Sequence, residues 1–199
     1  MSDSIVLATR NAHKLQELDR ILKNAGVDVE LLTVNHFPGA PEVDETEDSF
    51  EGNALLKARA LATFTGIPAI ADDSGLCVDA LNGSPGILSA RWSGASENVD
   101  VENMNLVLAQ TADTPEGERG AQFVCAAAYV NPDGTEIVVR GTVEGQLLTA
   151  PRGTNGFGYD PIFVPNGFDI TTAEMSSEQK DSMSHRSQAL AKLVAQITQ

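Results

Sequence analysis

The sequence is short of positive charge. Only 13 of its 199 residues are Lys or Arg, against 28 Asp or Glu, so the formal net charge is −15. This balance argues against duplex DNA, RNA or an acidic membrane surface as a partner, because each would be repelled. A small anion held by a few well-placed cations is still compatible with it. The cations that fall in short non-periodic segments are therefore informative: Arg10, Lys14, Lys57, Arg152, Lys180 and Arg186.

Cysteines and long apolar runs are also scarce. Cys77 and Cys125 both lie within apolar, strand-like runs, so we expect buried reduced thiols and no disulfide framework. No apolar run approaches the roughly 20 residues of a membrane span. The N-terminal segment places an acid before its first apolar run and only one base after it, which is not the pattern of a signal peptide. We therefore expect a cytoplasmic protein.

A glycine-rich phosphate loop is missing from the first strand–helix connection. Residues 4–9 predict a buried strand, and the apolar spacing after Asn11 predicts a helix that ends at Gly26. The start of such a helix attracts phosphate through its backbone N–H groups. Asn11 and Lys14 could both face an anion there. An ordinary helix cap with a solvated lysine is the alternative, and for this segment alone it is the stronger interpretation.

The stretch that organises the chain runs from Ala69 to Arg91. A short apolar run delivers Asp72 and Asp73 to a predicted Ser-Gly turn, and a second run, 76–78, leaves it. Adjacent carboxylates repel each other unless a cation or a shared proton compensates. Oxygen ligands at this density suit Mg²⁺, which one or two carboxylates usually hold together with substrate phosphates. A solvated turn is the alternative interpretation.

The remaining elements predict an α/β fold. Residues 27–34 read as a second strand, and Ser49 is expected to cap a helix that runs through Thr65 and places Lys57 near Glu45. A helix at 101–110 follows, and strands at 123–130 and 136–143 flank a turn. We therefore expect βαβ units followed by an antiparallel hairpin in one mixed sheet.

Two late segments carry polar or exposed-looking groups. Residues 154–163 are rich in glycine and contain Phe157 and Tyr159, which suit base stacking, although a core aromatic in a turn is as good a reading. A helix follows Ser184, so His185 and Arg186 fall in its first turn, where the helix dipole disfavours cations. An anion or an electron-rich base edge opposite them would explain this, and a salt bridge to the acidic loop is the structural alternative.

Five motifs follow one another across essentially the whole chain: TRNAHKLQEL, ETEDSFEGNALLKA, ADDSGLCVDALNGSPGILSARW, NGFGYDPIF and SHRSQAL. Together, and in this order, they resemble the inosine triphosphatase (Ham1-like) family of house-cleaning nucleoside triphosphate pyrophosphatases. The resemblance implies Mg²⁺-dependent hydrolysis of ITP, dITP and XTP to the monophosphate and pyrophosphate, in a homodimer. It also implies an elongated mixed β-sheet with flanking helices, in which residues 1–199 form one domain of two lobes around a central active-site cleft.

The resemblance also implies roles for individual residues. Asp73 is implied as the base for water and, with Glu45, as a metal-handling acid, and Asp72 is a further metal-ligand candidate. The implied phosphate binders are Asn11, Lys14 and Lys57, and Phe157 is the implied base-stacking aromatic. The other implied substrate contacts are Thr9, Arg10, Ala12, His13, Ser74, Gly158, Tyr159, Asp160, Lys180, His185 and Arg186.

Two other functions compete with this one. A metal-dependent phosphatase would release orthophosphate instead of pyrophosphate. A nucleotide sensor without catalysis would be expected to lack the acids, whereas Glu45, Asp72 and Asp73 are all present. The sequence therefore favours the enzyme.

Overall fold

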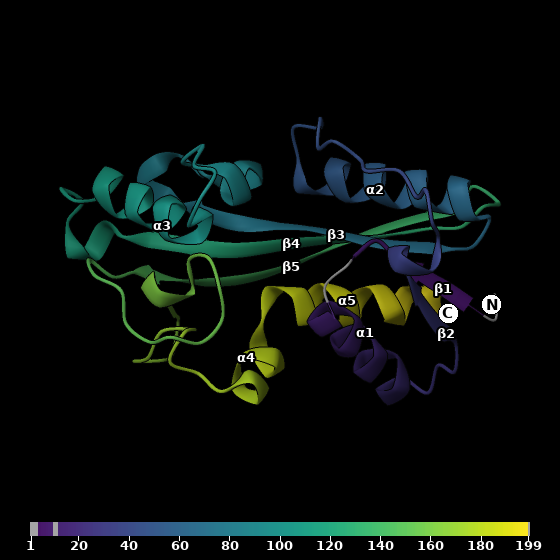
Figure 1. Ribbon diagram of the computed structural model, residues 1–199. Helices are drawn as coiled ribbons and strands as arrows, with labels where there is room; N and C mark the ends of the chain where they lie inside the picture. The colour runs from purple at the N-terminus through teal and green to yellow at the C-terminus, as the bar shows by residue number, and fades with distance from the viewer. Residues whose placement is uncertain (1–3, 10–11, 199) are drawn as a thin grey trace. The chain divides into compact units, whose positions relative to one another are not determined.

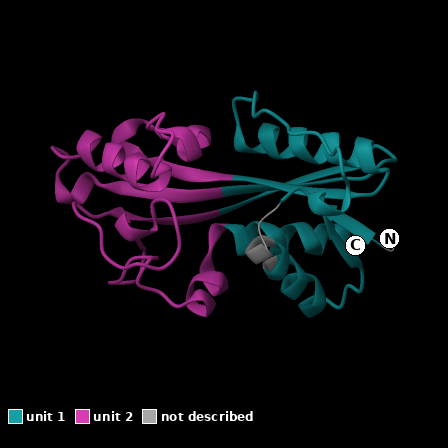
Figure 2. Cartoon of the chain, in the orientation of Figure 1, with its two compact units in different colours: residues 1–73, 125–141, 186–199 teal, residues 74–124, 142–185 magenta. Residues whose placement is uncertain are grey.

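The computed structural model describes residues 4–9 and 12–198, without the side chains of residues 12–14 and 17. The predictions for Arg10, Asn11 and the side chains of Ala12, His13 and Lys14 therefore lie outside the described residues. The chain divides into two compact units. Figure 2 colours unit 1, which comprises residues 1–73, 125–141 and 186–199, separately from unit 2, which comprises residues 74–124 and 142–185.

One mixed sheet has the strand order β2-β1-β3-β4-β5-β6. Its strands are β1 (Ser4–Leu7), β2 (Glu30–Thr33), β3 (Ala69–Val78), β4 (Gly120–Val130), β5 (Glu136–Leu147) and β6 (Phe163–Pro165). Strand β1 pairs in parallel with both β2 and β3, whereas β5 and β6 are antiparallel. The predicted βαβ units and mixed sheet are therefore confirmed.

Unit 1 has helices on both faces of its part of the sheet. Helix α2 (Phe50–Thr65) lies on one face, and α1 (Ala12–Asn24) and α5 (His185–Ile197) lie on the other (Figure 1). Leu18 and Leu22 of α1 and Leu190 and Leu193 of α5 pack in one buried cluster with Ile70 of β3. Side chains alternate between the faces of a strand, so the neighbours of Ile70 on β3 point toward α2.

Local signals fix the ends of α2. The Ser49 hydroxyl accepts a hydrogen bond from the Gly52 N–H at 3.1 Å, a cap that contributes about 1 kcal/mol. Gly66 follows the helix in the left-handed conformation, with φ of 67°, which glycine adopts without strain. The Ser49 cap and the helix end at Thr65 were predicted from the sequence. The connection before α2 contains the short 3₁₀ turn η1 (Val34–His36), so the second strand is shorter than the predicted 27–34.

Unit 2 is built around α3 (Val99–Gln110), which covers one face of its strands (Figure 1). Met104 and Val107 of α3 pack with Leu76 and Val78 of β3 and with Phe163 of β6. The short elements of this unit are η2 (Asp79–Leu81), η3 (Gly86–Arg91), η4 (Glu116–Glu118), η5 (Asp160–Ile162) and α4 (Ser177–Met183). Helix α4 was not predicted, since its sequence carries no apolar stripe.

The predicted turn at Asp72 and Asp73 is wrong. Residues 69–78 form one continuous ten-residue strand, with both acids in its interior. A Ser-Gly pair next to two acids is typical of a turn, but β3 lies between β1 and β4 in the sheet, and their pairing keeps it extended. Among the described residues, no helix is long and apolar enough to cross a membrane.

Candidate active site

Asp72 and Asp73 are both buried, and they point to opposite faces of the sheet. Their exposed fractions are 8% and 7%. Asp72 accepts a hydrogen bond from Arg186 on α5, whereas Asp73 contacts Asn53 and Lys57 on α2. The strand alternation therefore relieves the repulsion that adjacent carboxylates would suffer in a turn.

Two carboxylates share the Lys57 ammonium. Its Nζ lies 3.1 Å from Oε1 of Glu45 and 3.3 Å from Oδ1 of Asp73. Burial raises the pKa of Asp73, and the charge of Glu45 adds to this, while Lys57 and Asn53 act in the opposite direction without reversing the shift. Burial lowers the pKa of Lys57, but Asp73 and Glu45 outweigh it, so that pKa is raised and the ammonium stays charged. We call Glu45, Lys57 and Asp73 the acid–lysine group.

The acid–lysine group is suited to a divalent cation and to phosphate. Glu45 and Asp73 supply the hard oxygen ligands that Mg²⁺ prefers, and both carboxylates contact the same ammonium. Among the described residues, no three or more His, Cys, Asp and Glu side chains form a group that could hold a metal ion. Water and substrate phosphates would therefore complete the coordination of an ion at Glu45 and Asp73.

Arg186 pairs with a carboxylate of strand β3. Its Nε lies 3.2 Å from Oδ2 of Asp72, and both side chains are largely buried. The partner is 114 residues away in sequence, so no local pattern indicated it. The cation in the first turn of α5 is thus placed by a specific ion pair, which offsets the unfavourable helix dipole.

The glycine-rich segment of unit 2 carries one exposed aromatic ring. Phe157 is 62% exposed, and the Lys180 ammonium lies 5.3 Å from its ring centroid. A cavity of about 200 Å³ beside it is lined by Thr154, Asn155, Gly156, Phe157, Gly158, Pro161 and three residues of α3, Asp100, Val101 and Met104. An exposed ring over a small hollow suits a flat ligand such as a base.

Asp160 holds the glycine-rich segment in place through hydrogen bonds. It is 3% exposed, and its Oδ2 accepts hydrogen bonds from the Lys180 ammonium and, at 2.9 Å, from the Phe157 N–H. The Thr172 hydroxyl donates to Oδ1 at 2.8 Å. The Gly158 N–H donates to Asp100 at 3.1 Å. The segment that presents Phe157 is therefore held at both of its central residues.

Tyr159 is not the exposed aromatic that the sequence suggested. It is 5% exposed, and its hydroxyl donates to the Ser89 carbonyl at 2.8 Å. Burial, with the nearby Asp100 charge, raises the pKa of the phenol, so it stays protonated.

Three other predicted site residues are also among the described residues. His185 stacks on Phe123, with ring centroids 5.0 Å apart. Thr9 and Ser74 are half-buried.

The predicted residues thus form two groups, one within each unit. In unit 1, Lys57 contacts Glu45 and Asp73 on one face of the sheet, and Arg186 contacts Asp72 on the other. In unit 2, Lys180 contacts both Phe157 and Asp160. Asn53 was missed. It is fully buried on α2 and bonded to Asp73, and the available signal was a polar residue four positions before Lys57, on the same helix face.

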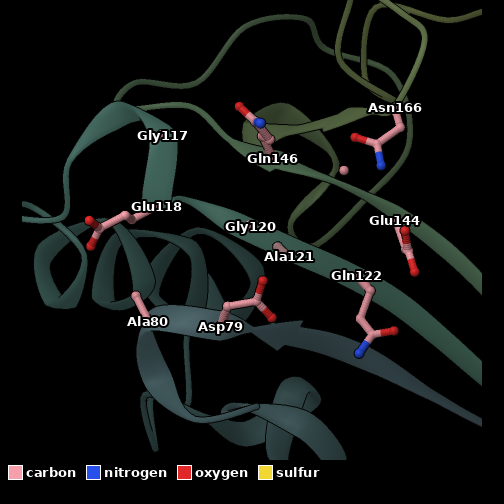
Figure 3. A pocket seen from close by; sticks show the side chains of 11 residues that line it. Asp79, Ala80, Gly117, Glu118, Gly120, Ala121, Gln122, Glu144, Gln146 and Asn166 are labelled. Atoms are coloured by element: carbon pink, nitrogen blue, oxygen red, sulfur yellow. The ribbon is translucent and has the colours of Figure 1, made fainter.

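Unit 2 also contains a larger cavity, of about 600 Å³, that does not suit a triphosphate (Figure 3). Its charged lining residues are Asp79, Glu118 and Glu144, and none of the described residues that line it is basic. The Asp79 carboxylate points toward Gly120, where a Cβ would lie 2.2 Å from Oδ2. An anionic ligand would be repelled, so size alone does not identify the candidate site.

Both cysteines are free, as predicted. Cys125 is buried, and Cys77 is only half-buried. Among the described residues, neither belongs to a group that could hold a metal ion.

Fold and site together define an α/β protein whose acid–lysine group is equipped for divalent-metal and phosphate chemistry. A model of the Ham1 family matches residues 5–196. The chain belongs to the Ham1 family, as the five motifs predicted.

Named relatives are similar over nearly their whole length. The chain is 54% identical over 190 residues to a dITP/XTP pyrophosphatase of Streptomyces avermitilis, covering 96% of this chain and 94% of that protein. It is 52% identical over 195 residues to the enzyme of the same name from Cutibacterium acnes, covering 97% and 95%.

Solved structures confirm the fold class. The nucleoside-triphosphatase / dITP/XTP pyrophosphatase of Mycobacterium abscessus superposes with a TM-score of 0.83 at 52% identity, covering 98% of this chain and 99% of that one. A HAM1 protein of Coxiella burnetii superposes with a TM-score of 0.90 at 38% identity, covering 98% of each chain. The mixed sheet with flanking helices is thus the fold of the family.

Proposed function

We propose that the protein hydrolyses the deaminated purine nucleoside triphosphates ITP, dITP and XTP to the monophosphate and pyrophosphate. The observation that carries this proposal is the buried Asp73 carboxylate, which shares the Lys57 ammonium with Glu45. It occurs in a chain more than 50% identical, over nearly full length, to proteins named dITP/XTP pyrophosphatase. The reaction removes deaminated purines from the nucleotide pool.

The acids and the lysine have different proposed roles toward the phosphates. Glu45 and Asp73 would hold Mg²⁺, with Asp72 as a further candidate, and the bound ion would neutralise phosphate charge and lower the pKa of water. Lys57 offers a positive charge to the triphosphate. Hydrolysis at phosphorus depends mainly on positioning and charge neutralisation, which the two acids, the ion and Lys57 would supply.

Asp73 is the proposed base. The oxygen of water forms a bond to the α-phosphorus, and the bond from that phosphorus to the bridging oxygen breaks, so pyrophosphate leaves with the electron pair. Asp73 takes the proton that the attacking water loses. The burial that raises its pKa makes the carboxylate a better proton acceptor than an exposed aspartate.

The base is proposed to bind at the exposed face of Phe157, with donors from Lys180, His185 and Arg186. Hypoxanthine and xanthine carry an acceptor oxygen at position 6, where adenine carries an amino donor. A site built to donate there leaves its donors unpaired with adenine, and an unpaired buried polar group costs about 1–3 kcal/mol.

A panel of nucleoside triphosphates with Mg²⁺, scored for monophosphate, pyrophosphate and orthophosphate, tests the proposal. We expect ITP, dITP and XTP to give equal amounts of monophosphate and pyrophosphate, far faster than ATP. Release of orthophosphate would support the phosphatase instead. Tight ITP binding without turnover would support a sensor.

We further propose that the protein acts as a cytoplasmic homodimer and that its two units are the lobes of one pyrophosphatase domain. Light scattering after size-exclusion chromatography tests the dimer, for which about twice the chain mass of 21.0 kDa is expected.

A further inference from the structure

Asn53 connects the two segments that carry the acids of the acid–lysine group. It lies on α2 and is fully buried. Its Nδ2 donates to Oδ2 of Asp73 at 3.1 Å, and its Oδ1 accepts from the Glu47 N–H at 3.1 Å. One amide therefore bonds to a strand carboxylate on one side and to the backbone of residues 45–47 on the other.

The segment that carries Glu45 folds closely over the start of α2. Ser49 caps the helix, and the Glu47 side chain lies so near Gly52 that a Cβ on Gly52 would be 2.7 Å from the Cβ of Glu47. Asn53 adds a hydrogen bond to this segment two residues after Glu45. The position of Glu45 thus depends on the same residue that holds Asp73.

The two oxygens of Asp73 are held from successive turns of α2. Lys57 contacts Oδ1, and Asn53, four residues earlier, contacts Oδ2. Residues four apart lie on the same helix face, so the helix presents both donors to one carboxylate. Only a side chain with a donor on one side and an acceptor on the other satisfies both partners of Asn53.

We propose that Asn53 is a positioning residue that fixes Asp73 and Glu45 at the separation required for a divalent cation. This inference rests on the proposed function for the reaction but concerns a residue that itself touches neither the phosphates nor the base. Partners that orient metal ligands typically change metal affinity or activity by about 10–100-fold when they are replaced.

The test compares Asn53→Leu with Asn103→Leu. Leucine has the same number and branching of side-chain heavy atoms as asparagine but no polar group. Asn103 is a matched control on α3, because it is 2% exposed, accepts from the Ser93 N–H at 2.7 Å and donates to the Ser89 carbonyl at 3.2 Å. Both variants should lose thermal stability, since each leaves buried partners unsatisfied.

Only Asn53→Leu should change metal binding. We expect Mn²⁺ to bind it about tenfold more weakly than wild type, as followed by electron paramagnetic resonance without nucleotide. In the ITP assay its kcat should fall by about tenfold or more and the Mg²⁺ concentration for half-maximal activity should rise, with little change in the KM for ITP at saturating Mg²⁺.

Unchanged Mn²⁺ affinity and kcat in folded Asn53→Leu would overturn the inference, and so would an equal loss in Asn103→Leu. If Asn53→Leu does not fold, Asn53→Ser, which leaves room for a water molecule, is judged by the same measurements. A wild type that binds Mn²⁺ but releases no pyrophosphate would reject the proposed function and leave the metal-binding comparison as the test of Asn53.

Discussion

Each unit contains a buried aspartate in contact with a lysine, but the two pairs differ in what else contacts the aspartate and the lysine. In unit 1 the Lys57 ammonium is shared between Asp73 and Glu45. In unit 2 the Lys180 ammonium contacts Asp160, which also accepts from the Phe157 N–H and the Thr172 hydroxyl. The first arrangement has two carboxylates for one cation, and the second has one carboxylate with three donors.

This difference distinguishes the proposed chemical site from a contact that holds a loop in place. A carboxylate surrounded by donors is fully satisfied, so Asp160 serves to hold its segment in place. Lys57 contacts two acids, and the pKa of Asp73 is raised by its burial and, to a smaller extent, by the charge of Glu45. Perturbed acids of this kind are enriched at functional sites. The following substitutions test the distinction, beginning with the largest effect.

Asp73→Asn should abolish most turnover. Loss of a general base typically costs about 10²–10⁴-fold in rate, and the loss of a metal-ligating charge adds to it. The amide also places a donor against either Lys57 or Asn53, at a cost of about 1–3 kcal/mol in stability, so the protein should still fold. Steady-state release of pyrophosphate from ITP measures the effect.

Asp79→Asn serves as the control for that substitution, because Asp79 is exposed and lines the larger cavity, away from Lys57 and Glu45 in the sequence and in the contacts described above. It should retain wild-type turnover.

Removal of divalent metal by a chelator should stop the reaction of the wild-type enzyme. Near-native turnover of Asp73→Asn would remove Asp73 from the mechanism, and full activity in the chelator would remove the metal.

Asp160→Ala should lower the free energy of unfolding more than it lowers the rate of hydrolysis. The change removes the carboxylate that accepts from Lys180 and from the Phe157 N–H, while the Thr172 hydroxyl keeps its bond to the carbonyl of residue 160 at 3.1 Å. Breaking a buried ion pair costs about 3–5 kcal/mol. We expect the low end of that range, because the Lys180 side chain is partly exposed. Urea unfolding measures it, and Asp160→Asn, which keeps an acceptor, should lose less. Equal stability of the two variants would contradict the anchoring role.

Arg186→Ala should narrow the preference for ITP over ATP by about tenfold in kcat/KM, equivalent to about 1.4 kcal/mol. The physical reason is the loss of a donor for the oxygen at position 6 of the purine. Arg152→Ala, an exposed arginine that pairs with Glu174, is the control and should leave the preference unchanged. If Arg186→Ala slows ITP and ATP equally, the residue acts on the phosphates or through Asp72, with which it pairs.

Disrupting the stacking of Phe123 on His185 should have the smallest effect, a small loss in the free energy of unfolding. Their stacked rings are expected to contribute about 0.5–1.5 kcal/mol beyond buried area. A double-mutant cycle with Phe123→Leu and His185→Ala, followed by urea unfolding, isolates that coupling energy. Strictly additive effects would show that the stack does not hold the histidine.

Local features of the fold were predictable because their causes are local. Ser49 and Gly66 delimit α2 through their own hydrogen bond and backbone conformation, and the NPDG turn joins β4 and β5 with a hydrogen bond from the Gly134 N–H to the Asn131 carbonyl. The proximity of Glu45 and Lys57 also followed from the helix that starts between them.

Features that depend on distant partners were not predictable. The Asp72–Arg186 pair joins residues 114 positions apart. The continuous β3 strand depends on its pairing with β1 and its place next to β4, and the burial of Tyr159 depends on the Ser89 carbonyl 70 residues earlier. A five-motif resemblance supplied the candidate residues, but it did not indicate which of them satisfy one another.

The extended course of β3 makes the number of residues before the acids a strict requirement. Deleting one residue between Ala69 and Asp72 would turn each later side chain to the opposite face of the sheet, as long as the strand kept its start. Asp73 would then face α5, and Ser74 would face Lys57 in its place. Insertions and deletions of one residue should therefore be far less tolerated here than substitutions of the same strand's apolar residues.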